Sequence, residues 1–220
     1  MPVADNLKRV TAELPESVRL VAVSKFHPAE AVMEAYDAGQ RIFGESRADE
    51  LTAKRAACPD DIEWHFIGHL QSNKVGRVVE AADVIQSIDS VRLLRRVDDA
   101  AARLGRRLKV FLQVHVAAEE TKFGFTPEEL DAEITPELLA GLRATEITGV
   151  MGMATNTDDT DRVRADFRAI RAAFELLKPR IAGLRDISMG MTDDHLIAIE
   201  EGSTMVRIGT EIFGARQYKN

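Results

Sequence analysis

Lys25 is the residue of this sequence that is best placed to carry out chemistry. It follows the apolar run from Leu20 to Val23 and Ser24, at a point where a strand is expected to end and a helix to begin. A lysine amine at the mouth of a parallel sheet has a lowered pKa when it is partly desolvated, and it can then hold an aldehyde as a Schiff base. We therefore expect Lys25 to bind a carbonyl compound.

Two turns near the far end of the sequence predict a phosphate site. The segments 188–192 (SMGMT) and 207–210 (RIGT) each place small residues directly after an apolar run. Glycines such as Gly209 let backbone N–H groups approach phosphate oxygens, and Ser188 and Thr210 offer hydroxyl groups. Either turn alone is more often only a turn. An aldehyde anchor combined with a phosphate site indicates pyridoxal phosphate (PLP).

Arg207 is expected to face the same ligand. It lies two residues before Gly209, so the period-two alternation of a strand puts both residues on one face together with Met205. If that face is inward, the guanidinium would donate to a pyridine nitrogen and keep it unprotonated. This arrangement disfavours reactions that use the ring as an electron sink. The alternative is an outward Arg207 in a salt bridge with a helix.

The elements that position these residues alternate along the whole sequence. Strand-like runs separated by amphipathic helical segments are typical of a parallel sheet with crossover helices. A helix near 4–13 leads, and strands are predicted at 20–24, 41–43, 62–67, 84–88, 108–116, 146–151, 185–188 and 205–208. No linker-like stretch divides the sequence, so we expect a single (β/α)8 TIM-type barrel with an additional N-terminal helix, as one domain over 1–220.

Closure of the barrel decides which residues become neighbours. In a closed barrel the first strand lies beside the eighth, so Lys25 would lie next to the loops after strands seven and eight, the usual phosphate position of this fold. In an open doubly wound sheet these elements need not meet.

Local signals also predict where several helices begin and end. Helices are expected to begin after 89–90, Thr126 and 157–159, where residues that cap helices precede apolar periodic segments. Four glycines are expected to end helices in a left-handed conformation: Gly39, Gly105, Gly141 and Gly202.

Composition excludes several classes of partner. The net charge of -7 argues against a surface that coats nucleic acid, and no run approaches the roughly 20 apolar residues of a membrane span. The one cysteine, Cys58, fits a reducing compartment, and the beginning of the sequence shows no signal peptide, so we expect a cytoplasmic protein. None of the five histidines has metal-ligand spacing, which predicts no metal site. His69 and His115 lie at the ends of predicted strands, where ligand contacts and loop or core roles both stay open.

At these residues the sequence resembles the YggS/PROSC family, the pyridoxal phosphate homeostasis proteins, which share the barrel of the alanine racemase N-terminal domain. The resemblance runs from Leu20 to Tyr218. Its segments are 22–25 (AVSK), 43–45 (FGE), 65–74 (HFIGHLQSNK), the set Glu119, Lys122 and Gly124, 188–191 (SMGM), and 207–216 (RIGTEIFGAR). It implies a Schiff base on Lys25, Arg207 opposite the pyridine nitrogen, and phosphate contacts from Ser188, Gly209 and Thr210.

Four positions depart from the family pattern: Ser46, His115, Ala117 and Thr192. The departures concern polar residues around the predicted site and leave the lysine in place. We assign no cofactor contact to Ser46 or His115.

The resemblance implies a protein that holds PLP reversibly on Lys25, buffers or regulates its supply to PLP-dependent apoenzymes, and has no catalytic residues. The alternative is an amino-acid racemase, which needs a second base on the other face of the substrate carbon. In alanine racemases that base is a tyrosine from an additional β-domain and reaches across a dimer. The sequence stops at Asn220, so we expect no such domain and a monomer, with Tyr36 in a helix and Tyr218 in the tail. A third interpretation is a barrel that binds another phosphorylated metabolite.

Overall fold

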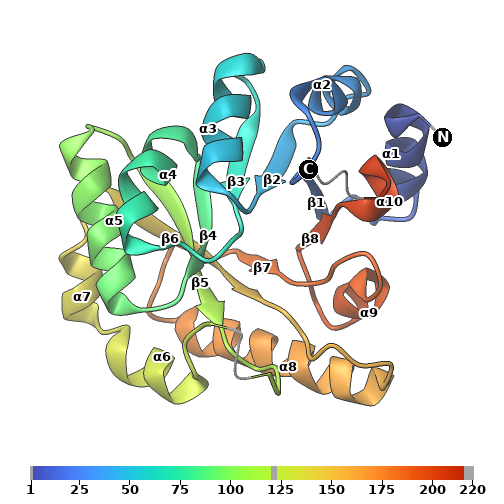
Figure 1. The fold of residues 1–220 in the computed structure, drawn as a ribbon. Helices are drawn as coiled ribbons and strands as arrows, with labels where there is room; N and C mark the ends of the chain where they lie inside the picture. Colours follow the sequence, from blue (N-terminus) through green and yellow to red (C-terminus); the bar gives the residue numbers. More distant parts are fainter. Residues whose placement is uncertain (1, 120–122, 216–220) are drawn as a thin grey trace.

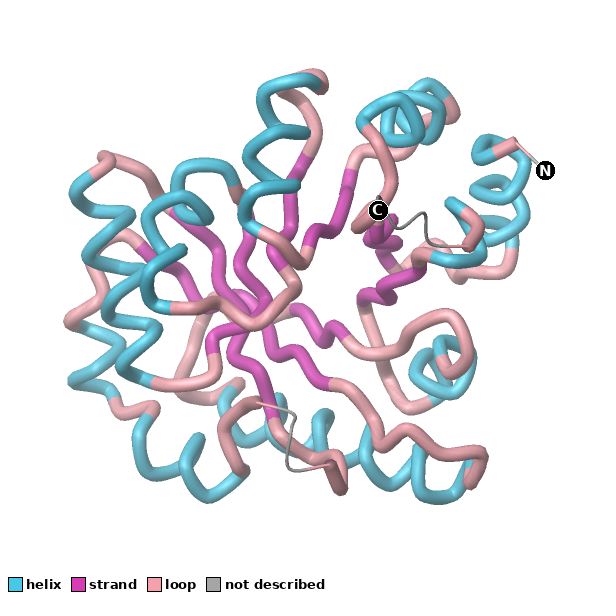
Figure 2. The backbone as a smooth tube through the Cα atoms, viewed as in Figure 1, coloured by secondary structure: helices cyan, strands magenta, loops and turns pink. Residues whose placement is uncertain are grey.

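Eight parallel strands close into a barrel that is surrounded by helices. The computed structural model describes residues 2–119 and 123–215. Each strand pairs with the next one along the chain, and β8 pairs with β1. Figure 2 shows the strands around the middle of the molecule and the helices outside them. The predicted (β/α)8 barrel is therefore confirmed.

All eight predicted strands are present. They are β1 (Arg19–Val23), β2 (Ile42–Glu45), β3 (Glu63–Phe66), β4 (Val84–Ile88), β5 (Leu108–Val114), β6 (Thr145–Gly152), β7 (Asp186–Ser188) and β8 (Met205–Ile208). Most of them are short apolar runs, and β1, β4, β5, β6 and β8 contain the Val and Ile residues that suit strands buried on both faces.

The helices lie between the strands, with one additional helix at the beginning (Figure 1). They are α1 (Val3–Ala12), α2 (Ala29–Asp37), α3 (Ala48–Ala57), η1 (a 3₁₀ turn, Ser72–Lys74), α4 (Val75–Ala81), α5 (Val91–Arg103), α6 (Pro127–Glu133), α7 (Pro136–Ala140), α8 (Thr160–Leu177), α9 (His195–Glu200) and α10 (Thr210–Phe213). The additional N-terminal helix is thus confirmed as α1. Among the described residues no helix is both long and apolar enough to cross a membrane.

The predicted helix starts have the expected caps. The side chains of Ser90 and Asp159 accept backbone N–H groups at the beginning of α5 and α8, and Thr126 forms a capping box with Glu129 at α6.

Three of the four glycine predictions are also confirmed, because Gly39, Gly105 and Gly202 have positive φ. Gly141 does not: its φ is -80°, so the prediction of a left-handed residue there was wrong. The chain continues past α7 in a helical turn, in which Leu142 donates to the carbonyl of Leu139, and this turn needs no left-handed residue.

The seam between β1 and β8 closes the barrel where the site was predicted. Val21 is in register with Arg207, and Ala22 with Ile208. Figure 1 shows α1 and α10 side by side outside this seam. Asn6 of α1 donates to the carbonyl of Ile212 at 3.1 Å, and Arg9 pairs with Glu211 at 3.3 Å. The first helix and the last helix of the described chain therefore cover the same joint.

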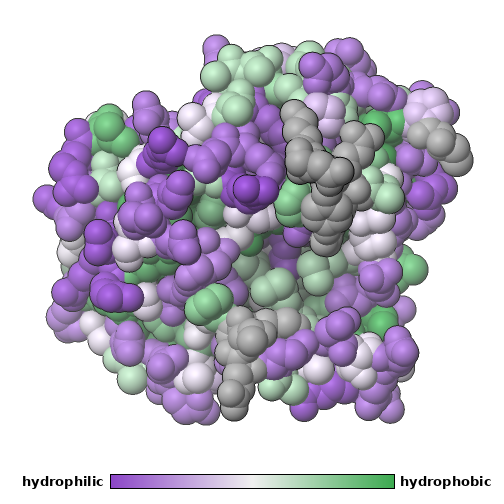
Figure 3. Space-filling model, in the orientation of Figure 1, coloured by the Kyte–Doolittle hydropathy of each residue, from purple (hydrophilic) through white to green (hydrophobic). Residues whose placement is uncertain are grey.

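Apolar side chains fill two separate regions. The larger core lies between the strands and the helices. A smaller cluster, made of Val21, Val84, Phe111, Met151 and Met205, fills part of the barrel interior. Figure 3 shows hydrophilic residues gathered over the outer helices and apolar patches nearer the middle of that face.

Candidate functional site

A cavity of about 310 Å³ opens at the carboxyl ends of the strands. Ligand pockets in proteins begin at about this size, and barrels of this kind place them at this end. The lining residues come from six of the eight strands and the loops that follow them: Val23, Lys25, His27, Ser46, Ile67, Gly68, His69, Met151, Met153, Met191, Thr192, Arg207, Gly209 and Thr210.

Lys25 lines this cavity from the loop after β1. The preceding residue, Ser24, is fully buried, and the next residue, Phe26, has a φ of 67°, which is rare for a side chain of this size. The backbone N–H of Phe26 donates to Glu50 Oε2 at 2.8 Å. This hydrogen bond to α3 stabilises the left-handed backbone conformation of Phe26, directly after Lys25.

A buried ion pair lies directly beneath Lys25. Lys54 Nζ is 2.5 Å from Glu45 Oε1 and donates to the carbonyl of Ser24 at 2.7 Å, and the Ser24 hydroxyl also donates to Glu45 at 2.6 Å. Burial raises the pKa of Glu45, and the neighbouring Lys54 opposes that rise. Glu45 follows a predicted strand, but its side chain bonds to Lys54 and Ser24 and does not line the cavity.

Gly209 and Thr210 line the cavity from the other side of the seam. A Cβ at Gly209 would lie 3.0 Å from the carbonyl oxygen of Val23, so glycine permits the close approach of the two strand ends. Thr210 begins α10, and N–H groups in the first turn of a helix have no acceptor within the helix. Lys25 and the turn after β8 therefore line the same cavity.

Arg207 points inward, so the interpretation of an outward salt bridge was wrong. Its side chain lines the cavity and is 4% exposed. The guanidinium donates to Ser188 O and Ser188 Oγ, both at 2.7 Å, and to Gly152 O at 2.9 Å. Burial lowers the pKa of Arg207 to about 10, and nearby Asp194 opposes this effect. Arg207 therefore stays a cation at neutral pH.

Ser188 lies beneath the cavity and does not line it. It is in register with Met205, whose side chain belongs to the barrel interior, and its hydroxyl is bound by Arg207 and Gln86. In the same turn Asp194 Oδ1 accepts the N–H of Met191 at 2.6 Å. Thr192 is the residue of this turn whose side chain type and place at the cavity suit an anion.

Several cavity residues follow no sequence signal. Ser46 was assigned no contact, yet its buried hydroxyl has no hydrogen-bond partner among the described residues. His27 lines the cavity with its ring centre 5.4 Å from that of Phe213, and burial lowers its pKa. Ile67, Met153 and Met191 add apolar surface. Their directions depend on turns between elements, which the hydrophobic periodicity does not describe.

The two histidines left open have different places. His69 lines the cavity, lies 3.3 Å from Asp89, and stacks on Phe123 with 3.8 Å between ring centres. His115 does not line the cavity, and its Nε2 lies 3.2 Å from the carbonyl of Glu119.

Two features of the described residues bear on a second base and on metal binding. Tyr36 bonds to Asp61 on the surface at 2.9 Å and does not line the cavity. No group of three or more histidine, cysteine or acidic side chains in residues 2–119 and 123–215 could hold a metal ion. Lys122, Arg216 and Tyr218 lie outside the described residues. The cavity thus combines an amine, a buried guanidinium, and hydroxyl and backbone donors.

Known proteins share this fold and much of this sequence. The family model described as alanine racemase, N-terminal domain, matches residues 2–217. A pyridoxal phosphate homeostasis protein of Vibrio alginolyticus is 38% identical, and the match covers 98% of each chain. The structure of PipY of Synechococcus elongatus PCC7942 with PLP bound is 42% identical, with a TM-score of 0.88, and the match covers 96% of this chain and 100% of that one.

A likeness to alanine racemase is one of fold. An alanine racemase of Clostridium difficile 630 has a TM-score of 0.81 at 15% identity, and the match covers all of this chain but 57% of the racemase.

Proposed function

The chain belongs to the alanine racemase N-terminal domain family, in which its curated relatives are named pyridoxal phosphate homeostasis proteins, and we propose that it holds PLP on Lys25 as part of PLP homeostasis. The observation that carries this proposal is that Lys25, Arg207, Gly209 and Thr210 line one cavity. The amine and the turn after β8 are 185 residues apart in sequence, and the seam between β1 and β8 brings them together.

The residues at the cavity fit PLP in type and in position. The cofactor supplies an aldehyde that condenses reversibly with an amine. Lys25 provides that amine, and the product is a Schiff base. The hydroxyl and backbone N–H of Thr210 bind the phosphate, with Gly209 leaving room for it. Ser46 lines the cavity, and its hydroxyl has no hydrogen-bond partner among the described residues. We propose that this hydroxyl turns to a polar ligand, which favours a polar occupant.

Arg207 is proposed to face the pyridine nitrogen and to donate to it. Because its pKa of about 10 keeps the guanidinium protonated at neutral pH, the nitrogen accepts a hydrogen bond and stays unprotonated. A pyridine ring with an unprotonated nitrogen is a weaker electron sink for a bound amine. This property suits a protein that stores the cofactor.

The racemase alternative has only the fold in its favour. The alanine racemase of Clostridium difficile 630 is 15% identical to this chain. Tyr36 bonds to Asp61 away from the cavity. The relatives of 38% to 40% identity carry the homeostasis name. A chiral assay with free amino acids distinguishes the two, because sustained turnover that Lys25→Ala abolishes would require the racemase assignment.

We also infer the setting in which the protein acts. The proposed recipients are PLP-dependent apoenzymes, because a homeostasis protein must release what it holds. The single cysteine supports a reducing compartment such as the cytoplasm, and the net charge of -7 supports a protein that does not bind nucleic acid. We further propose a monomer of one domain that acts away from membranes.

Borohydride reduction tests the ligand and the residue together. The protein is incubated with PLP, reduced, digested and mapped by mass spectrometry. We expect a phosphopyridoxyl group on the peptide that contains Lys25. Lys25→Ala should lose the adduct, and Lys74→Ala, which changes a partly exposed lysine outside the cavity lining, should keep it.

Two outcomes would overturn the proposal. An adduct spread over surface lysines, with none enriched at Lys25, would leave the cavity without its assigned ligand. Equal labelling of the wild-type protein and Lys25→Ala would have the same consequence.

A further inference from the structure

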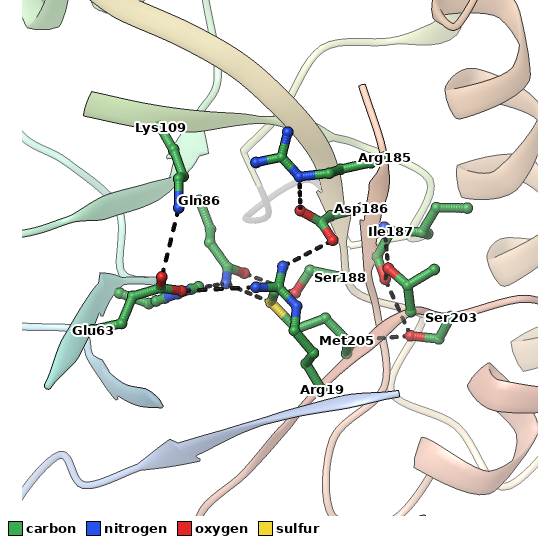
Figure 4. Close-up of polar contacts among 12 residues, drawn as sticks. Arg19, Glu63, Gln86, Lys109, Arg185, Asp186, Ile187, Ser188, Ser203 and Met205 are labelled. Atoms are coloured by element: carbon green, nitrogen blue, oxygen red, sulfur yellow. Dashed lines mark hydrogen bonds and ion pairs between the residues drawn. The ribbon is translucent and has the colours of Figure 1, made fainter. Parts of the chain in front are cut away.

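A continuous series of hydrogen bonds crosses the inside of the barrel from the cavity toward the opposite end. We call it the interior chain, and it consists of Arg207, Ser188, Gln86, His65 and Glu63. The successive distances are 2.7 Å from Arg207 Nη1 to Ser188 Oγ, 2.7 Å from Ser188 Oγ to Gln86 Oε1, 2.6 Å from Gln86 Nε2 to His65 Nδ1, and 2.7 Å from His65 Nε2 to Glu63 Oε1. Figure 4 shows Glu63, Gln86 and Ser188 pointing toward one another from β3, β4 and β7.

Every hydrogen bond of the interior chain has the same direction. Arg207 can only donate, so the Ser188 hydroxyl accepts from it and gives its own proton to the Gln86 oxygen. The Gln86 amide then donates to His65 Nδ1, which leaves the proton of a neutral imidazole on Nε2, facing Glu63. The donors all point from the cation at the cavity to the carboxylate at the opposite end.

This direction addresses an electrostatic need of Arg207. The guanidinium is buried, and its hydrogen bonds to the described residues go to uncharged oxygens of Ser188 and Gly152. Asp194 lies near enough to act on its charge, but no carboxylate among the described residues lies within ion-pair distance of it. A buried charge is costly unless surrounding dipoles or counter-charges stabilise it. Hydrogen bonds that point the same way polarise one another and extend the influence of Glu63 to Arg207.

We propose that Gln86 is a positioning residue for Arg207, acting through Ser188 to fix the guanidinium at the ring nitrogen of PLP, and that His65 must be neutral for it to do so. This inference rests on the proposed function. Gln86 suits the role because a primary amide accepts and donates at once without carrying charge. It is fully buried, and its amide also contacts Met205 Sδ at 3.2 Å, which limits its rotation.

The neutral state of His65 follows from its surroundings. Protonation at Nδ1 would place two donors face to face at Gln86. The charged groups that act on His65 are Glu63 on β3, Arg19 on β1 and Asp83 before β4. Lys109 on β5 pairs with Glu63, and Asp186 on β7 pairs with Arg19. Burial is the largest influence and lowers the pKa of His65 below its ordinary value, which agrees with a neutral ring.

The test compares Gln86→Leu with a matched neighbour. Ser87→Ala changes the next residue of β4, which is equally buried and whose hydroxyl has no partner among the described residues. We expect Gln86→Leu to weaken PLP binding about tenfold, equivalent to about 1.4 kcal/mol. The absorption spectrum of bound PLP should move toward that of Arg207→Met. Ser87→Ala should change neither.

A double-mutant cycle separates positioning from general damage. If Gln86 acts through Arg207, adding Gln86→Leu to Arg207→Met should change the PLP dissociation constant by less than twofold. The absorption maximum of bound PLP should then stay where it is in Arg207→Met. Equal effects of Gln86→Leu in both backgrounds would contradict the inference, as would wild-type affinity and spectrum in the single variant. Urea unfolding of each variant verifies that the proteins compared are folded.

Gln86→Glu provides a conservative variant with a pH signature. The carboxylate still accepts from Ser188, but it can bond to His65 only if Nδ1 carries a proton. The ratio of its PLP dissociation constant to that of the wild-type protein should therefore fall as pH is lowered from 8 to 6. A ratio that is constant or rises toward acid would count against the inference.

Nitrogen NMR of the cofactor-free protein tests the interior chain independently of PLP. At pH 7.5 we expect His65 to have a proton on Nε2 and none on Nδ1. The opposite tautomer would overturn the inference whether or not PLP binds. Failure of borohydride trapping at Lys25 with the expected tautomer would instead remove the proposed function, so the two failures are distinguishable.

Discussion

At Gly68 the turn after β3 passes against the turn after β2 with no space for a side chain. A Cβ at this position would overlap the backbone carbonyl group of Ser46, and backbone cannot rotate away as a flexible side chain can. Both residues line the cavity. The width of the cavity on this side is thus fixed by one glycine.

Gly68→Ala should therefore damage both binding and stability. We expect a loss of about 1 to 3 kcal/mol in the free energy of unfolding, typical of overpacking, and weaker PLP binding because the two turns move apart. Urea unfolding and a PLP titration measure the two effects. Gly76→Ala is the control, since a Cβ there meets nothing within 4 Å in helix α4, and it should stabilise the protein by about 0.5 to 1 kcal/mol. Unchanged binding in Gly68→Ala would contradict the account of the cavity wall.

Single residues show how far the sequence predicts the site. Lys25, Gly209 and Thr210 could be found because they directly follow apolar strands, and all three line the cavity. Ser188 follows the same logic but is the last residue of the short strand β7, so its side chain faces the barrel interior. The orphaned hydroxyl of Ser46 depends on a turn whose geometry no periodicity encodes.

At the scale of elements, helix α3 supports the loop that carries Lys25. Its Lys54 reaches the carbonyl of Ser24 at the end of β1 and Glu45 at the end of β2, and its Glu50 accepts the N–H of Phe26. Lys54 is 5% exposed, so this contact is screened little by water. One helix therefore connects the first two strands at the cavity.

Removal of the Lys54 cation should leave Glu45 as an uncompensated buried charge. We expect Lys54→Met to lower the free energy of unfolding by about 3 kcal/mol, and Glu45→Gln in addition to recover part of the loss. Lys74→Met changes a more exposed lysine and should alter the stability by less than about 0.5 kcal/mol. Chemical unfolding of the wild-type protein and the three variants checks this, and a loss in Lys54→Met no larger than in Lys74→Met would refute the coupling.

Strands and helices were predictable to different degrees. Short strand-like runs that alternate with helical segments marked all eight strands, although β2, β3 and β7 contain few Val, Ile or Leu residues. Strands β4 and β8 have the predicted bounds. Gly141 shows a limit, because a glycine near a helix end indicates a left-handed residue only where the chain turns sharply away.

At the scale of the whole molecule, closure of the barrel produces the site. The register that pairs Val21 with Arg207 cannot be read from either strand alone, and only the count of eight alternating units predicted that β1 and β8 meet. The same closure creates an interior in which polar residues of β3, β4, β7 and β8 form the interior chain. This chain was not predicted, because each member reads as an isolated polar residue within an apolar strand.

The interior chain also predicts how stability depends on pH. Burial lowers the pKa of His65, so below pH 6.5 the unfolded chain takes up a proton that the folded protein does not. Stability should fall as pH drops from 6.5 toward the pKa of the folded state, by up to about 1.4 kcal/mol per pH unit for this residue. Glu63, whose pKa is lowered to about 2 chiefly by its hydrogen bond to His65, adds a further loss below pH 4.5.

His65→Gln should flatten the first part of this dependence. Urea unfolding at pH 7.5 and 5.5 gives the change in stability for each protein. The lowered pKa of His27 contributes in the same direction in both, so the difference between the two proteins isolates His65. An equal loss in the wild-type protein and the variant would show that His65 is not the buried neutral residue described above.

A crystal structure of the protein with PLP tests whether Lys25 and the turn after β8 hold the two ends of the cofactor, because it locates both ends at once. We expect continuous density from Lys25 Nζ to the ring, the phosphate against Gly209 and Thr210, and Arg207 at the ring nitrogen. Density for PLP on another lysine, or with its phosphate away from the joint between β1 and β8, would contradict this expectation.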